Sequence, residues 1–161
     1  EKAPEWRGQR VFVRHEVDGK GYELRLSEES AGTQKLMGLA AYLMTALERG
    51  ATVVVDELDA KLHPKLLRYV ILLFKDPEVN KSGAQLIFSS QDVSTMRNDV
   101  FRRDEIWFAA RGEGEASQLW SLADIHEANG NLVSKNAAFD KQYLSGRYGA
   151  DPYLTRIEEW D

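Results

Sequence analysis

The sequence predicts an α/β fold in which helices flank a parallel sheet and antiparallel hairpins accompany that sheet. Two short apolar runs, 51–55 and 85–90, are separated by a helical pattern, and such an alternation is typical of a parallel sheet. Nearer the two ends of the chain, apolar residues recur at every second position, which is typical of hairpins. With 161 residues, we expect a single domain over 1–161.

The first predicted elements are a hairpin and a helix. Apolar residues alternate in 10–17 and again in 22–26, on either side of a glycine-containing turn, which predicts a β-hairpin. From Thr33 to Leu47 the apolar spacing changes to three and four residues, which predicts a helix. Gly50 stands where a glycine would end that helix in a left-handed conformation.

The central elements are strand, helix and strand. The β-branched run 51–55 predicts a strand buried on both faces of a parallel sheet. Pro64 suits the first position of a helix, which we expect to end near Asp76. The segment 85–90 predicts the second strand of the sheet, and this strand closes on the polar residues that begin at Ser89.

A second hairpin is expected beyond the parallel sheet. The segments 105–110 and 118–122 flank a Gly-Glu-Gly turn, and mixed helix and turn follow from about Ala123. We expect Trp107, Phe108 and Trp120 to pack in the core or on the sheet rather than to stack on nucleic-acid bases, because strand aromatics usually do so. We expect Arg102 and Arg103 to lie on a solvated strand edge, whereas Arg147 stands within the segment Ser-Gly-Arg-Tyr-Gly and is given no role.

The composition excludes several classes of protein. The formal net charge of −5 excludes a strongly basic nucleic-acid binder, although it leaves room for a local basic patch. The chain has no cysteine, which excludes a disulfide scaffold, a thiolate metal site and a cysteine nucleophile, and which fits a cytoplasmic protein. The apolar runs are too short for a membrane span, so no membrane partner is expected.

Polar residues directly follow both predicted parallel strands. Asp56 and Glu57 follow the first strand, and ligands of parallel sheets bind at the carboxyl ends of the strands. One such carboxylate can hold Mg²⁺ while its neighbour polarises a water molecule. A solvated acidic turn is the alternative. The polar segment 89–92 follows the second strand, and taken alone it predicts a loop in which Asp92 caps the next helix.

A third polar segment, Ser30-Ala31-Gly32-Thr33-Gln34, stands at the start of the first helix. Exposed backbone amides and the positive end of the helix dipole make such a position suitable for an anion. The alternative is that Ser30 only caps the helix.

The order of these segments resembles that of the ABC-type P-loop ATPases. Residues 29–34 resemble the signature motif, 53–57 the Walker B strand, 58–59 the D-loop and 86–91 the strand that leads to the switch residue. The closer resemblance is to the SMC-like and OLD-like branch of prokaryotic ATPases that are linked to defence loci. It covers roughly 22–152 and includes motifs at 29–33, 56–64, 101–108 and 143–150.

The resemblance implies roles for individual residues. Asp56 would hold Mg²⁺, and the catalytic Glu57 would orient or deprotonate the attacking water. Asp59 would communicate across a dimer interface. Gln91 occupies the catalytic switch position, where histidine is usual in this branch, and its amide cannot carry a proton at neutral pH. The residues that would contact ATP bound to the opposite subunit are Ser30, Gly32, Thr33 and Gln34.

One motif of the family is missing. No Gly-x-x-x-x-Gly-Lys-Ser/Thr loop occurs, because the Gly19-Lys20 pair is followed by glycine within the first hairpin. We therefore expect the C-terminal lobe of an ABC-type domain, whose phosphate-binding lobe precedes Glu1. A degenerate protein that never binds nucleotide in cis is the alternative. His63 belongs to a Leu-His-Pro turn, and we do not assign it to the switch position.

The resemblance implies an ATPase with ATP and Mg²⁺ as cofactors and with a homodimer formed around ATP. The resemblance also allows two further kinds of partner, an effector protein and DNA or RNA. Two other functions are considered beside it. One is a nucleotide-independent scaffold or interaction module. The other is a DNA-repair-type ATPase head with coiled-coil arms, although the chain itself shows no sustained heptads.

Overall fold

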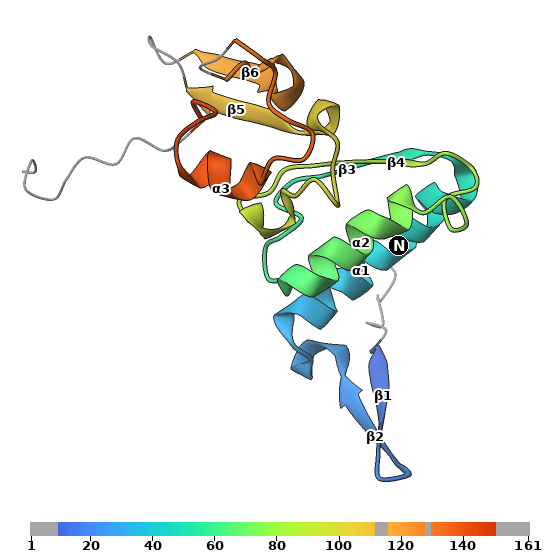
Figure 1. Ribbon diagram of the computed structural model, residues 1–161. Helices are drawn as coiled ribbons and strands as arrows, with labels where there is room; N and C mark the ends of the chain where they lie inside the picture. Colours follow the sequence, from blue (N-terminus) through green and yellow to red (C-terminus); the bar gives the residue numbers. More distant parts are fainter. Residues whose placement is uncertain (1–9, 112–115, 128–129, 151–161) are drawn as a thin grey trace, which may run out of the picture. The chain divides into compact units, whose positions relative to one another are not determined.

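The computed structural model describes residues 10–111, 116–127 and 130–150 (Figure 1). Its backbone contacts divide the chain into two compact units, Glu1–Ser90 and Gln91–Asp161, which are described one after the other. No helix in the described ranges is both long enough and apolar enough to cross a membrane.

The first unit contains the hairpin, helix, strand, helix and strand that the periodicity predicts. A short 3₁₀ helix, Leu26–Glu28, joins the hairpin to the first long helix. The elements are β1 (Phe12–Val17), β2 (Lys20–Arg25), α1 (Ala31–Arg49), β3 (Thr52–Val55), α2 (Pro64–Lys75) and β4 (Gln85–Phe88).

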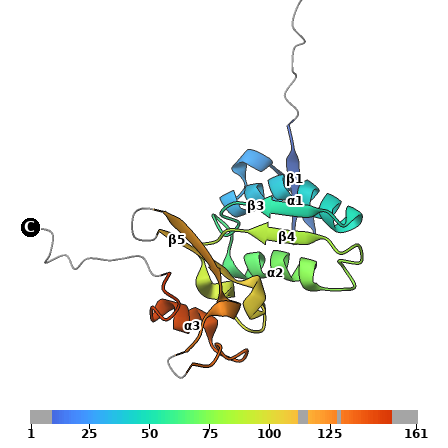
Figure 2. The ribbon, with the colours of Figure 1, turned by 90° about the horizontal axis from the view of Figure 1, so that it is seen from above.

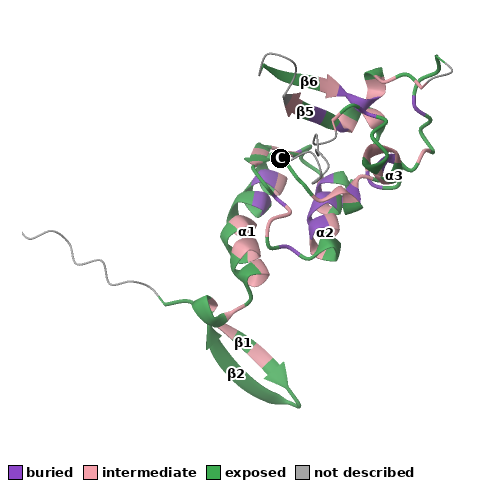
Figure 3. Cartoon of the chain, turned by 90° about the vertical axis from the view of Figure 1, so that its left-hand side faces the viewer, coloured by how far each residue is buried: buried purple, intermediate pink, exposed green. Residues whose placement is uncertain are grey.

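The β1–β2 hairpin is antiparallel and turns through two residues with left-handed backbone. Asp18 and Gly19 have φ angles of 51° and 73°, which suit a tight two-residue turn. Most of the hairpin is exposed (Figure 3). In the hairpin and the residue before it, the exposed apolar side chains are Val11, Phe12, Val17, Tyr22 and Leu24, which are 42–54% exposed.

The parallel pair β3–β4 is covered on one face. Both α1 and α2 lie on that face (Figures 1 and 2), where Val53 and Val55 are half-buried. On the other face, Val54 and its directly paired partner Ile87 are 74% and 55% exposed. The prediction that 51–55 is buried on both faces is therefore wrong for the described part of the chain, because α1 and α2 both pack on the same side of the strands.

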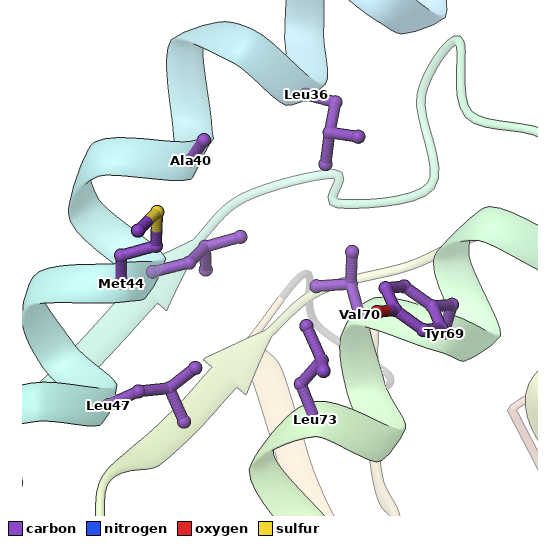
Figure 4. A pocket seen from close by; sticks show the side chains of 8 residues that line it. Leu36, Ala40, Met44, Leu47, Tyr69, Val70 and Leu73 are labelled. Atoms are coloured by element: carbon purple, nitrogen blue, oxygen red, sulfur yellow. The ribbon is translucent and has the colours of Figure 1, made fainter. Parts of the chain in front are cut away.

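The two helices face each other across an apolar groove (Figure 4). Its lining side chains are Leu36, Ala40, Leu43, Met44, Leu47, Tyr69, Val70 and Leu73. Apolar residues at spacings of three and four residues therefore bring α1 and α2 together, as the sequence pattern predicts.

Local signals set the ends of both helices. The Ser30 hydroxyl accepts a hydrogen bond from the amide of Thr33 and so caps α1, and Gly50 ends α1 with φ of 70°. Pro64 opens α2, and His63 caps it. These findings confirm the predicted start of α2 and the predicted end of α1.

The second unit contains a second antiparallel hairpin and a short helix. These are β5 (Trp107–Arg111), β6 (Ser117–Ser121) and α3 (Phe139–Leu144). Three 3₁₀ helices, Val93–Thr95, Arg103–Glu105 and Leu122–Asp124, lie between the longer elements. Asp92 caps the first of these 3₁₀ helices, as predicted. The buried residues of its hydrophobic core cluster are Ile106, Phe108, Leu122, Val133, Phe139 and Tyr148.

The aromatic residues of the hairpin divide between its faces. Phe108 is buried and its ring stacks on Tyr143 at 5.7 Å, while Trp120 is half-buried beside it. Trp107 is 57% exposed, because adjacent strand residues point to opposite faces. Packing in the core is therefore confirmed for Phe108, and Trp120 packs against that core, whereas Trp107 lies on the exposed face of the hairpin.

Candidate functional site

The polar residues that follow the two parallel strands meet at the carboxyl edge of the pair. The Ser89 hydroxyl, after β4, donates a hydrogen bond to the carboxylate of Asp56, after β3. It also accepts a hydrogen bond from the backbone amide of Glu57, at 2.8 Å. The backbone amide of Ser89 donates a hydrogen bond to the backbone oxygen of Val55 at 3.1 Å, and its backbone oxygen accepts one from the amide of Leu58 at 3.0 Å. Ser89 thus holds both the Asp56 carboxylate and the backbone of the candidate base.

Glu57 has a left-handed backbone with φ of 48°, which is uncommon for a residue with a side chain. Its carbonyl oxygen accepts hydrogen bonds from the Ala60 amide at 3.0 Å and from Nζ of Lys35 at 2.5 Å. The next residue, Leu58, is fully buried, whereas Asp56 and Glu57 are exposed. The turn therefore presents two adjacent carboxylates to solvent above an apolar anchor.

The candidate signature segment forms the first turn of α1. The hydroxyl oxygens of Ser30 and Thr33 lie 2.9 Å apart, and the Ser30 hydroxyl also accepts a hydrogen bond from the backbone amide of Thr33 at 3.1 Å. The Gln34 side chain donates to the backbone oxygens of Glu29 and Ser27, at 2.8 and 3.4 Å. The capping interpretation of Ser30 is therefore correct, and a hydroxyl that caps a helix still lies among its N-terminal amides, where an anion binds.

This signature segment also touches the turn that follows Glu57. A Cβ atom on Gly32 would lie 2.8 Å from the backbone oxygen of Lys61, so only glycine fits without a shift. Lys61 itself has φ of 65°. The fold therefore brings the candidate signature segment close to the turn that carries the candidate Walker B and D-loop residues.

Asp59, the candidate D-loop residue, is half-buried. Within the described residues, its Oδ1 atom is buried without a hydrogen-bond partner. Its backbone oxygen accepts the Leu62 amide at 2.9 Å, so the D-loop region is itself a hydrogen-bonded turn.

The candidate switch residue and the nearby histidine lie in different settings. Gln91 is the first residue of the second unit, whereas Asp56, Glu57 and the signature segment belong to the first unit. The Nδ1 atom of His63 accepts the Lys65 amide at 3.1 Å, as the capping residue of α2. His63 thus has the structural role that its Leu-His-Pro turn predicts.

A further contact joins the β1–β2 hairpin to the signature segment. Nε2 of His15 lies 2.5 Å from Oε1 of Glu29, the residue just before Ser30, and the Glu29 side chain is largely buried. The position of the capping residue therefore depends on the hairpin as well as on α1.

Ser89 and Lys35 are the two site residues that the sequence analysis did not single out. Ser89 stands in a polar run that a loop explains equally well, and Lys35 is one lysine on a helix. Their contacts cross 32 and 22 residues of sequence, so only the folded chain shows them. The one local signal was the position of Ser89 at the carboxyl end of a parallel strand.

The site suits Mg²⁺ as part of a magnesium–nucleotide complex. Among the residues that the structure describes, no three His, Cys, Asp or Glu side chains gather in a metal-binding group. Mg²⁺ usually takes one or two protein carboxylates and completes its shell with phosphate oxygens and water. Asp56, which is exposed and oriented by Ser89, matches that mode of binding.

Comparison with known proteins gives one family. A family model described as "AAA domain, putative AbiEii toxin, Type IV TA system" matches residues 3–97, which is more than half of the chain and includes all the candidate site residues. Curated proteins and solved structures give no match. With the signature segment, the carboxylate pair and Ser89 all inside the matched region, the chain belongs to this AAA domain family of nucleotide-binding P-loop ATPases.

Proposed function

We propose that the chain is the signature and Walker B half of an ABC-type ATPase, in the SMC-like and OLD-like branch. The observation that carries the proposal is the meeting of Asp56, Glu57 and Ser89 at the carboxyl edge of β3 and β4, next to the first turn of α1. Carboxylates in this position hold magnesium and orient water in phosphoryl transfer.

Each residue then has a chemical task. Asp56 binds Mg²⁺, which neutralises charge on the phosphates. Glu57 orients the attacking water and accepts its proton, and Ser89 holds the Asp56 carboxylate and the Glu57 main chain. Gln91 supplies an amide that can hydrogen-bond the γ-phosphate or the water.

The remaining parts of the site come from elsewhere. The sequence has no phosphate-binding Gly-Lys loop, so we propose that a separate lobe binds the β- and γ-phosphates. In this proposal, Ser30, Gly32, Thr33 and Gln34 contact ATP held by the other subunit of a homodimer, and Asp59 lies at the interface. Hydrolysis to ADP and phosphate then changes the state of that dimer, and the changed dimer acts on an effector of a defence system.

The charge of the chain favours a protein effector over nucleic acid. With a net charge of −5, the 161 residues provide no overall attraction for the phosphates of DNA or RNA. A DNA or RNA partner would therefore have to bind elsewhere on the complete protein.

ATP-dependent dimerisation of the complete protein tests the proposal. Light scattering with Mg²⁺ and ATP should show a persistent dimer for Glu57→Gln, because ATP is bound but not hydrolysed. Ser30→Arg should remain monomeric, since it places a bulky side chain where the phosphate binds. Ser27→Arg, three residues earlier in an exposed 3₁₀ helix, is the matched control and should dimerise normally. If ATP does not change the oligomeric state of wild type or of any variant, the protein would instead be a nucleotide-independent scaffold.

A further inference from the structure

Lys35 joins the signature helix directly to the Walker B turn. It follows Gln34 in the early part of α1, and its Nζ atom donates to the backbone oxygen of Glu57 at 2.5 Å. The ammonium group therefore contacts the main chain of the residue that we assign as the base.

The conformation of Glu57 depends on contacts of this kind. A left-handed backbone is disfavoured for a residue with a Cβ atom, and it persists only where neighbours hold it. Three hydrogen bonds hold the Glu57 main chain. Its amide donates to the hydroxyl of Ser89, and its carbonyl oxygen accepts from the Ala60 amide and from Nζ of Lys35. Of these, only the bond from Lys35 comes from the signature helix.

A second contact supports the same connection. Gly32 lies so close to Lys61 that a Cβ atom would be 2.8 Å from its carbonyl oxygen. The start of α1 is thus in backbone contact with the far end of the turn that begins at Glu57. A displacement of the signature segment must therefore displace that turn or break both contacts.

On the basis of the proposed function, we propose that Lys35 is a positioning residue that couples the two ATP sites of the dimer. The signature segment of a subunit touches one ATP, and Glu57 of the same subunit acts on the other. Phosphate contact at the first turn of α1 fixes the helix, and the fixed helix holds Lys35 on the Glu57 carbonyl. The coupling involves two states of the turn. In one state Glu57 is held in the left-handed region, and in the other Glu57 has left that region.

The first test needs no nucleotide. Hydrogen–deuterium exchange of the complete protein should show faster exchange of the amides in 57–62 for Lys35→Met. Lys35→Arg should restore slow exchange, because a guanidinium can also donate to the carbonyl. Lys81→Met removes an exposed lysine of the same unit in the same way and should leave exchange in 57–62 unchanged. Unchanged exchange in Lys35→Met would overturn the linkage.

The second test measures ATP turnover. In Lys35→Met, kcat should fall by about tenfold with little change in KM, since a displaced base weakens the chemical step more than binding. Dependence of the rate on ATP concentration should lose its cooperativity, and Lys35→Arg should recover both properties. Equal rates and cooperativity in Lys35→Met and wild type would overturn the coupling. If wild type has no turnover while exchange changes as expected, the proposed function fails and the Lys35 linkage remains.

Discussion

At the scale of single residues, Ser89 explains how a short strand end becomes an ordered site. An aspartate and a glutamate that follow a strand are free to form an ordinary acidic turn. Here one hydroxyl donates to the carboxylate of Asp56 and accepts from the backbone amide of Glu57, so the Asp56 side chain and the Glu57 main chain are held by the same residue. The proposed chemistry therefore depends on this hydroxyl in addition to the two acids.

Replacing Ser89 by alanine should therefore reduce ATP turnover by roughly 10- to 100-fold, because small displacements of a positioned group have effects of this size. Ser89→Thr keeps the hydroxyl and should retain most of the activity. Steady-state hydrolysis of both variants provides the comparison. Equal activity of Ser89→Ala and wild type would show that the hydroxyl does not position the carboxylates.

A second residue-scale prediction concerns alkaline pH. Burial, followed in importance by the charge of Glu127, raises the pKa of Tyr148 from 10.0 to about 12. Between these values the unfolded chain loses the phenol proton while the folded chain keeps it. The free energy of unfolding of the second unit should therefore fall as the pH rises from 10.0 towards 12.

Tyr148→Phe tests this prediction. It removes the titrating group, together with the hydrogen bond from the phenol to Gln142 at 2.7 Å. The variant should be less stable at neutral pH, but its stability should decline less steeply in the alkaline range. Chemical unfolding at a series of pH values measures both effects. Parallel declines for the two proteins would mean that Tyr148 does not titrate in this way.

At the scale of elements, the sequence could predict most of the local structure. Periodicity predicts the two hairpins, α1, α2 and the two parallel strands, and Gly50, Pro64 and Asp92 mark helix ends where they were expected. Burial is harder to predict, because it depends on which side of a strand other elements pack. Val54, Ile87 and Trp107 are exposed because of the tertiary packing, which no local sequence pattern predicts.

Gly50 gives a prediction at this scale. It ends α1 with φ of 70°, and a Cβ atom there would lie 2.3 Å from the backbone oxygen of Ser82. Gly50→Ala should thus destabilise the protein by about 2–4 kcal/mol, from left-handed strain and overpacking together. Gly83→Ala is a useful control, since φ is 72° there but nothing lies near the added Cβ. Urea unfolding should show the larger loss for Gly50→Ala.

At the scale of the whole molecule, the candidate site is built from segments distant in sequence. The signature segment, the carboxylate pair and Ser89 span residues 30 to 89, and the fold brings them together at one edge of the parallel pair. The order of the candidate motifs can be read from the sequence, because it is a property of the chain. The roles of Ser89 and Lys35 could not, because those roles exist only as contacts.

The most direct test of the ATPase proposal is steady-state ATP hydrolysis by the complete protein with Mg²⁺, comparing wild type with Glu57→Gln. Glu78→Gln, the same change at an exposed position beyond α2, is the control. We predict turnover in wild type and in the control, and a loss of at least about 100-fold in Glu57→Gln, in line with removal of a general base. Turnover in Glu57→Gln equal to that of wild type would contradict the assignment of Glu57 and, with it, the proposed site.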